Sequence, residues 1–153
     1  MRSIETTLGL WVSRLMTSDQ VKEWAWGEVA RLDCPQQELF DLASDGPERC
    51  LKRAIHDFPP RPFRLTYVQE FSLRALATSL GSTEDELRLT EWASRHAMGE
   101  DLTHPLVALG YQLDHYLNDC DDQEGARSLL RKELPSLLSQ CEALAAPFNE
   151  SAA

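Results

Sequence analysis

The stretch from Thr66 to Gly99 constrains the fold more than any other part of the chain. Between Arg64 and Glu84 its only charged residues are Glu70 and Arg74, and a helix with so little charge is usually surrounded by protein. Apolar residues recur at helical spacing along the first half of this stretch and predict a buried face. They are Val68, Phe71, Ala75, Leu76 and Leu80.

A sharp turn is expected to separate this helix from the next. Gly81 suits the position just past a helix end, where glycine takes a positive φ at little cost. Thr83, with Glu86 three residues on, predicts a capping box at the start of the second helix. The core side of that helix is expected to contain Leu89, Trp92, Ala93, His96 and Ala97.

Similar patterns predict six further helices. The first covers Ser3 to Met16, with an amphipathic stripe from Ile4 through Leu8 and Val12 to Met16, and a Thr17–Gln20 capping box starts the second. The second helix buries Val21, Trp24, Ala25 and Leu32. A third covers Gln36 to Ala43 with Pro35 at its first position, and a fourth turns Cys50, Leu51, Ala54 and Ile55 inward. A helix near Pro105 and a last one over Gln123 to Ala146 complete the set.

Two residues are expected to shape the last two helices. Gly110 allows a close approach between helices, and Pro135 predicts a kink or a break near Glu133.

The expected architecture is all-α: a single-domain irregular bundle of about seven or eight short helices over residues 1–148, with a frayed tail at 149–153. A chain of 153 residues buries roughly 70% of its unfolded surface, so it needs neither disulfide nor metal to fold. The prolines from Phe58 to Pro62 exclude a helix there. We interpret this segment as a rigid extended connector and not as a domain boundary.

The chain shows no sign of export or of membrane insertion, and we expect it in the cytosol. Its start, MRSIETTLGL, includes Glu5 and lacks a small-residue cleavage site, and no uncharged apolar run reaches the roughly 18 residues of a membrane span. Cys34, Cys50, Cys120 and Cys141 form no C-x-x-C pair, so they are expected to be buried thiols.

Negative charge is concentrated in the C-terminal half. Residues 1–76 contain 10 basic and 11 acidic residues, whereas residues 77–153 contain 5 basic and 14 acidic ones, which accounts for most of the net charge of −10. This argues against nucleic-acid binding by that half, because phosphates require a positive surface. It fits a basic protein partner and plain solubility equally well.

No sequence motif indicates catalysis. His115 and Asp119 are four residues apart on a helix, so both could face one metal, but no second histidine follows four residues after His115 and a closed metal site needs three or four ligands. Glu84, Asp85 and Glu86 are explained by the first turn of a helix, where acidic residues favour the macrodipole. We therefore expect no cofactor, no metal and no enzymatic activity.

Two other features have alternative interpretations. The locally basic segment from Arg49 to Arg64 is either a nucleic-acid contact or a solvated face that pairs with the acidic half, and the second is favoured. Trp26 lies off the inner face of its helix, where it is either a second packing contact, which is favoured, or an exposed aromatic side chain.

Residues 10–44 carry a resemblance to a known group of proteins. They combine Thr17 and Asp19 at a cap, Val21, Trp24 and Ala25 in a core pattern, and a Glu-Leu-x-Asp-Leu-Ala stretch made of Glu38, Leu39, Asp41, Leu42 and Ala43. This pattern resembles small acidic helical bacterial immunity-type proteins, some of which are partners of secreted toxins. The resemblance implies a helical fold and transfers no binding residue.

The leading hypothesis is a non-enzymatic immunity or inhibitor protein that masks a basic partner, such as a bacterial toxin domain. Binding is expected through three acidic clusters of the C-terminal half: Glu84, Asp85 and Glu86; Glu100 and Asp101; and Asp119, Asp121, Asp122 and Glu124. One alternative is a cytosolic adaptor or loading chaperone for a secreted protein, which would use Trp26 and the Phe58–Phe63 connector. Another is a small helical metal-dependent hydrolase built on His96, His104 or His115.

Overall fold

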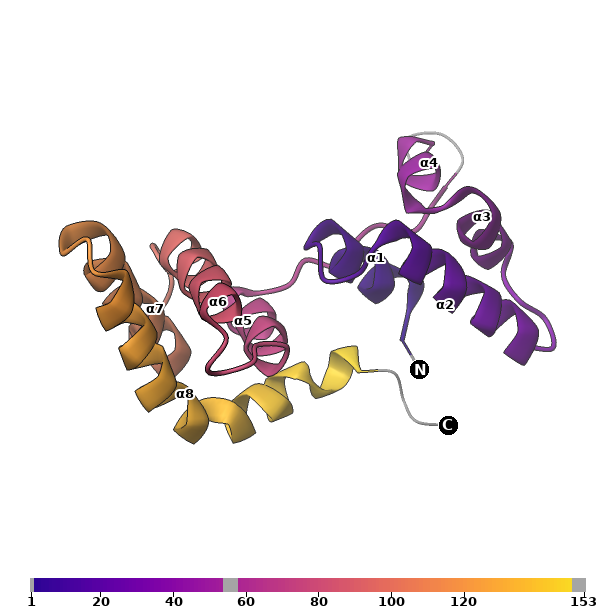
Figure 1. The fold of residues 1–153 in the computed structure, drawn as a ribbon. Helices are drawn as coiled ribbons and strands as arrows, with labels where there is room; N and C mark the ends of the chain where they lie inside the picture. Colours follow the sequence, from indigo (N-terminus) through magenta and orange to yellow (C-terminus); the bar gives the residue numbers. More distant parts are fainter. Residues whose placement is uncertain (1, 54–57, 150–153) are drawn as a thin grey trace. The chain divides into compact units, whose positions relative to one another are not determined.

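The computed structural model describes residues 2–53 and 58–149, and in this part of the chain the protein is all-α, as predicted (Figure 1). Eight α-helices and no β-strand occur over these residues. The helices are α1 (Ile4–Val12), α2 (Ser18–Arg31), α3 (Gln37–Asp45), α4 (Pro47–Lys52), α5 (Tyr67–Leu76), α6 (Thr83–His96), α7 (Pro105–Asp114) and α8 (Gln123–Ala145). A π-helical turn, η1 (His115–Asp119), follows α7, and a 3₁₀ turn, η2 (Ala146–Phe148), follows α8.

The contacts within the chain divide it into two compact units, which are described separately below. Unit 1 comprises residues 1–65 and 148–153, and unit 2 comprises residues 66–147. The expected single domain over residues 1–148 stays a prediction. Ala54 and Ile55, which were expected to face inward, lie outside the described residues, as do positions 150–153 of the expected frayed tail.

Unit 1 forms its helices at the expected caps. The capping box of Thr17 and Gln20 is confirmed: the Gln20 N–H donates to Thr17 Oγ1 over 3.2 Å, and the Thr17 N–H donates to Gln20 Oε1 over 2.9 Å. Between α3 and α4, Gly46 has a φ of 82° and Pro47 occupies the first turn of α4. The turn at these two residues thus separates two short helices.

The core of unit 1 contains the expected inner face of α2. Side chains from α1 to α4 and from the connector bury one another there: Ile4, Leu8, Val21, Trp24, Ala25, Leu39, Leu42, Ala43, Cys50 and Phe58. The connector residue Phe63 is fixed through its backbone, because its N–H donates to the Glu5 carbonyl over 2.8 Å. The extended segment is therefore tied to α1.

Several expectations about unit 1 are wrong in detail. The first helix ends at Val12 and not at Met16, since Arg14 takes a left-handed conformation with a φ of 60°, and Val12 is 56% exposed. Trp26 is 51% exposed, so the packing contact favoured for it is not made. Pro35 precedes the N-cap Gln36 and does not occupy the first helical position.

Unit 2 packs α5 to α8 around an aromatic cluster centred on Trp92. The Tyr67 and His96 rings both stack on Trp92, with centroids 5.3 and 4.8 Å away, and the Arg74 guanidinium lies 5.0 Å from the centre of the Trp92 ring. Arg74 also pairs with Glu70 at 2.8 Å. The two charges of the central stretch thus neutralise each other, and this lets an otherwise apolar helix pack against its neighbours.

The central pair of helices forms where it was expected but differs at its ends. Phe71 and Ala75 are buried, whereas α5 stops at Leu76, so Leu76 and Leu80 are exposed. Gly81 has the expected positive φ, of 98°. The N-cap of α6 is Ser82 and not Thr83, with the Asp85 N–H donating to Ser82 Oγ.

Further expectations concern His96, Gly110 and the cysteines. His96 was expected in the core, but it is exposed and reaches back to the Trp92 carbonyl. A Cβ on Gly110 would lie 2.7 Å from Cβ of Ala97, which confirms the close helix approach. All four cysteines are free, but only Cys50 and Cys141 are buried, whereas Cys34 and Cys120 are exposed, contrary to expectation.

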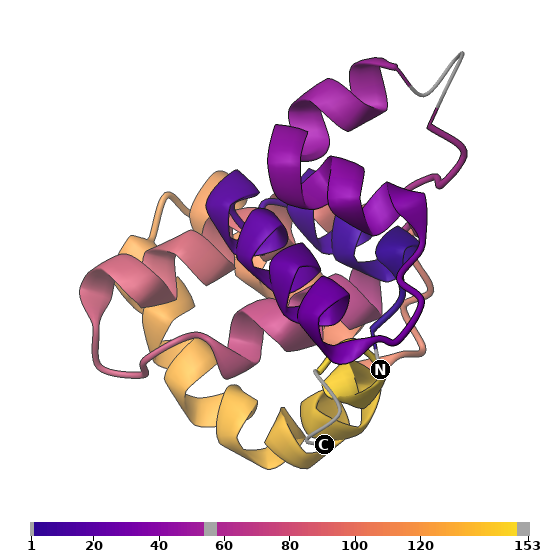
Figure 2. The same ribbon diagram turned by 90° about the vertical axis from the view of Figure 1, so that its right-hand side faces the viewer.

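Helix α8 accommodates Pro135 without a break. It runs unbroken from Gln123 to Ala145, and it changes direction along its length in both ribbon views (Figures 1 and 2). A proline removes one backbone N–H and crowds the carbonyl four residues before it, which bends a helix. The bend expected near Glu133 is therefore present and the break is not.

Candidate functional site

The structural division of the chain nearly coincides with its division of charge. Unit 2 contains 14 acidic and 6 basic residues, a net charge of −8, whereas unit 1 contains 11 acidic and 9 basic residues, a net charge of −2. The candidate acidic surface thus belongs to α5–α8 and the turns between them.

Glu86 differs from the other candidate residues because it is completely buried. Its Oε1 accepts hydrogen bonds from Nε and Nη2 of Arg127 at 3.1 and 2.9 Å. Its Oε2 accepts one from the Gly81 N–H at 3.2 Å and lies 3.4 Å from Nε of Arg131. A buried carboxylate requires such complete pairing. The expectation that Glu86 contributes to an exposed cluster is therefore wrong, and its role is to join α6 to α8.

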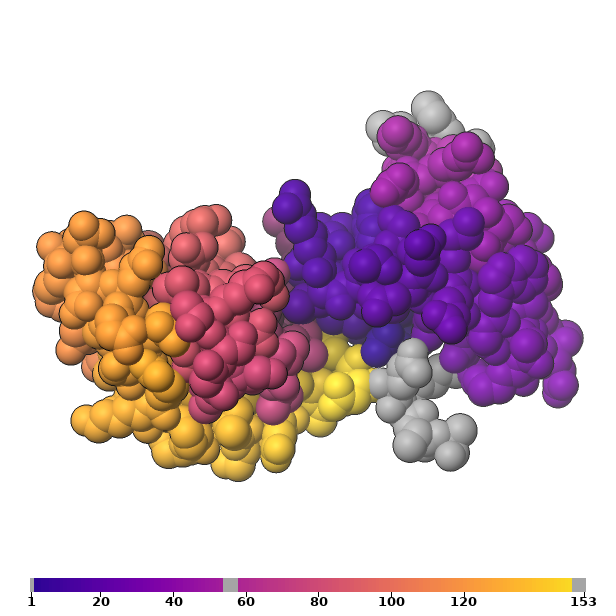
Figure 3. All heavy atoms as spheres, viewed as in Figure 1, coloured from indigo at the N-terminus to yellow at the C-terminus, as the bar shows by residue number. Residues whose placement is uncertain are grey.

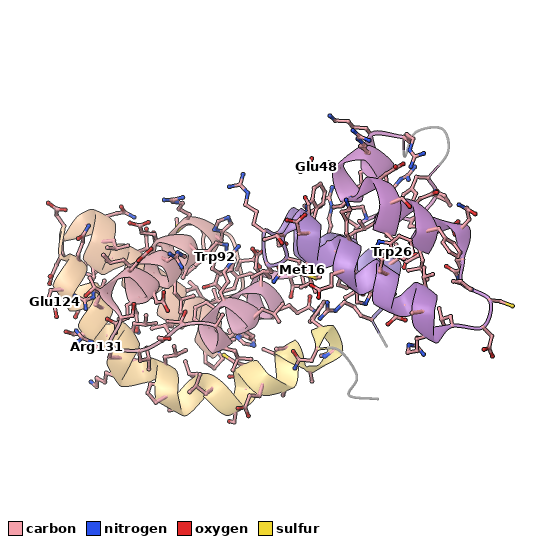
Figure 4. All side chains as sticks on the ribbon, turned by 45° about the vertical axis from the view of Figure 1, so that its right-hand side comes forward. Met16, Trp26, Glu48, Trp92, Glu124 and Arg131 are labelled. Atoms are coloured by element: carbon pink, nitrogen blue, oxygen red, sulfur yellow. The ribbon has the colours of Figure 1, made fainter. Side chains whose placement is uncertain are left out.

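Glu124 lies on the outer side of the same arginines. Its carboxylate is 2.8 Å from Arg127 Nη1 and 2.9 Å from Arg131 Nη2, and its side chain is 67% exposed. Glu124 and Arg131 come from the first turns of α8 (Figure 4). Each arginine thus bridges a buried carboxylate and an exposed one.

The first turn of α6 adds two further carboxylates. Glu84 is 82% exposed and pairs with Arg88 at 2.7 Å. Asp85 accepts a hydrogen bond from the Ser79 N–H at 3.0 Å and lies 3.6 Å from Arg88. Glu84 is thus exposed, whereas the Asp85 side chain is 28% exposed, so the surface pair of Glu84 contributes little to stability and its carboxylate remains able to contact a partner.

Three aspartates lie immediately before α8. The Asp119 side chain is 68% exposed and lies 2.9 Å from Nδ1 of His115. Asp121 has a φ of 48°, and Asp122 caps α8 by accepting a hydrogen bond from the Gly125 N–H at 2.8 Å. Figure 3 shows the atoms of this region, in orange, at the surface of unit 2.

We call these residues together the α6–α8 acidic end, because Glu86 of α6 and Glu124 of α8 share Arg127 and Arg131. It comprises Glu84, Asp85, Asp119, Asp121, Asp122 and Glu124. With the buried Glu86 there are seven carboxylates against Arg88, Arg127 and Arg131, which leaves a net charge of −4. Glu86 and Glu124, which come from two of the three acidic clusters named from the sequence, are thus joined through Arg127 and Arg131. Asn118, next to Asp119, instead lies against Ser94, nearer the C-terminal end of α6.

The third cluster, Glu100 and Asp101, lies elsewhere on unit 2. It follows the C-terminal end of α6, and the 14 residues of that helix rise about 21 Å from its acidic first turn. Hydrogen bonds from the backbone N–H and the hydroxyl of Thr103 hold the pKa of Asp101 below its ordinary value. Both carboxylates are exposed, but they do not belong to the α6–α8 acidic end.

The three candidate histidines have separate partners. The ring of His96 stacks on Trp92, that of His104 caps α7 by accepting the Leu106 N–H, and that of His115 contacts Asp119. Within residues 2–53 and 58–149, no three or more His, Cys, Asp or Glu side chains form a group that could hold a metal ion.

The basic segment from Arg49 to Arg64 makes contacts within unit 1. Arg53 pairs with Asp45 at 2.8 Å, and Arg61 donates to the Phe58 carbonyl at 2.7 Å. The guanidinium groups of both arginines therefore already have partners within unit 1.

The residues missed from the sequence are the arginines that organise this surface. Arg127 and Arg131 are four apart on one face of α8, and Glu124 precedes Arg127 by three residues. That spacing indicates intrahelical ion pairs. The tertiary partner, Glu86, is 41 residues away from Arg127, and no local pattern shows it.

No protein-family model, curated protein or solved structure matches the chain. Among the described residues, no helix is both long enough and apolar enough to cross a membrane.

Proposed function

We propose that the protein is a non-enzymatic inhibitor of the immunity type, which masks a basic protein partner with unit 2. The observation that carries the proposal is the α6–α8 acidic end, whose carboxylates outnumber the three arginines that pair with Glu84, Asp85, Glu86 and Glu124. A basic toxin domain is the kind of partner such a surface fits.

Complementary charge acts mainly on the rate of association. A surface with an excess of one sign steers an oppositely charged partner during encounter, and this effect falls with ionic strength. Asp85 and Asp122 each accept a hydrogen bond from a backbone N–H. These two carboxylates are therefore already positioned before a partner binds, which lowers the entropy cost of binding for them.

The test asks first whether a toxin-type gene lies beside the gene for this chain, and it uses the protein product of such a gene as the basic partner. Association rates with this basic domain are measured at low and at physiological salt. The variant is Glu84→Gln with Asp121→Asn, because Glu84 is highly exposed and asparagine tolerates the left-handed conformation of Asp121. Neither change touches the buried pair of Glu86. We expect association about fivefold slower at low salt and a flatter salt dependence.

The matched control removes the same charge elsewhere on unit 2, through Glu91→Gln with Glu142→Gln, both at exposed positions. If both double variants slow association equally, net charge and not the acidic end determines binding. If neither changes the rate, or if binding is indifferent to salt, the proposal is wrong.

An adaptor or loading chaperone remains the alternative proposal, favoured by the exposure of Trp26 (Figure 4). Phe58 cannot take part as expected, since it is only 2% exposed, whereas Phe63 is 46% exposed. Under this alternative Trp26→Ala abolishes binding and the charge variants leave it unchanged. The hydrolase hypothesis has no comparable support.

A further inference from the structure

The π-helical turn η1 brings a cysteine, a histidine and an aspartate into one row. Sγ of Cys120 lies 3.6 Å from Nε2 of His115, and Nδ1 of His115 lies 2.9 Å from Oδ2 of Asp119. A row of nucleophile, base and orienting carboxylate is the arrangement that activates a thiol. The sequence suggested only the His115–Asp119 pair.

The row depends on the widened turn. The Cys120 N–H donates to the His115 carbonyl at 3.1 Å, which is the i to i+5 bond of a π-helix. This bond places Cys120 beside His115, while Asp119 at i+4 reaches the other side of the same ring. In an α-helix, only the residues at i+3 and i+4 face residue i.

The hydrogen bonds determine the tautomer of the imidazole. An ionised carboxylate only accepts hydrogen bonds, so Asp119 selects the tautomer with its hydrogen on Nδ1. Nε2 is then left with a free lone pair that faces the Cys120 thiol. His115 is therefore set to accept the thiol proton.

The surroundings indicate which reagents reach the thiol. His115, Asp119 and Cys120 are all exposed, so a small molecule has direct access, and the site is too open to enclose a larger substrate. Asp119, Asp121 and Asp122 surround it with negative charge, which attracts cations and repels anions.

From this geometry we propose that Cys120 is a reactive thiol that forms mixed disulfides with small cationic disulfides. The proton of the thiol moves to Nε2 of His115 as the sulfur attacks one sulfur of the disulfide. A new S–S bond forms at Cys120 and the original S–S bond breaks. The departing thiolate takes the proton back from Nε2, so Cys120 is oxidised and half of the reagent is released as a reduced thiol. This reactivity goes beyond the proposed inhibitor function and does not depend on it, although Asp119 also belongs to the α6–α8 acidic end.

The chain supplies its own control in Cys34, which is exposed in the loop between α2 and α3 and has no histidine within 20 residues of it in the sequence. The other two thiols are protected, since burial raises the pKa of both Cys50 and Cys141. The probe is cystamine, a cationic disulfide, and the readout is the rate of adduct formation at each cysteine by mass spectrometry near neutral pH.

We expect Cys120 to react at least about tenfold faster than Cys34 in the folded protein, since a positioned base contributes a factor of this size or more. His115→Asn should slow adduct formation at Cys120 by a similar factor and leave the rate at Cys34 unchanged. Glutathione disulfide, which is anionic, should react with Cys120 more slowly than cystamine does, and added salt should reduce that difference.

Three results would overturn the proposal. They are equal rates at Cys120 and Cys34, a rate at Cys120 that His115→Asn does not change, and an advantage of Cys120 that persists in denaturant, where the row no longer exists. Circular dichroism of His115→Asn verifies that the exposed substitution leaves the fold intact.

Discussion

Removing Arg127 should reveal how strongly the buried Glu86 depends on its partner. Arg127→Met keeps the apolar part of the side chain and deletes two hydrogen bonds to Oε1 of Glu86. Hydrogen bonds to charged groups contribute about 1.5–3 kcal/mol each. The Gly81 N–H and Arg131 still hold Oε2, so we expect the lower end of the range for a broken buried pair, about 3 kcal/mol.

The assay is equilibrium urea unfolding followed by circular dichroism, together with thermal melting. A loss of this size lowers the melting temperature by about 6–12 °C for a chain of this length. The control is Arg95→Met, which removes an exposed arginine 3.7 Å from Glu91 and should cost less than about 1 kcal/mol.

A double variant separates the cost of a stranded charge from the loss of packing. Glu86→Leu combined with Arg127→Met removes both charges, so it should be more stable than Arg127→Met alone. The reasoning fails if Arg127→Met is no less stable than Arg95→Met. It also fails if the double variant loses as much unfolding free energy as Glu86→Leu and Arg127→Met lose together.

Two further predictions concern the core of unit 2. Gly110→Ala should destabilise the protein by about 1–3 kcal/mol, because the added Cβ would clash with Cβ of Ala97 and with the Tyr67 hydroxyl. The control Gly27→Ala, at a helical position with open space around it, should be neutral or slightly stabilising, and equal melting curves for both would show that the close approach is absent. Burial raises the pKa of Tyr67, so the unfolded chain releases this proton at lower pH than the folded one does. Stability should therefore fall as the pH rises above about 10. Tyr67→Phe should reduce that alkaline loss in urea titrations, and an identical pH dependence in both proteins would contradict the assignment.

Local patterns in the sequence were enough to predict the helices and much of the core. The capping box at Thr17, the turn glycine Gly81 and the apolar stripe through Phe71 depend on neighbours within about one helical turn. The low charge between Arg64 and Glu84 likewise predicted a buried helix, and the Glu70–Arg74 pair explains how that helix tolerates its two charges.

Helix ends were less predictable, because they depend on contacts outside the local pattern. The sequence alone placed the end of the first helix at Met16, whereas the left-handed Arg14 ends it after Val12. It also placed His96 in the core by its spacing, although that residue is exposed and its ring stacks on Trp92.

Only the tertiary structure decided which acidic residues share a surface. Glu84 and Glu86 are alike in sequence, both in the first turn of α6, yet one is 82% exposed and the other is buried. The difference arises because Arg127, far along the chain, reaches Glu86 from α8 and supplies the charge that makes burial possible. Arg127 also pairs with the exposed Glu124, whereas Glu100 follows the far end of α6. The sequence determined how much negative charge this half of the chain carries, whereas long-range ion pairing determined where that charge is exposed.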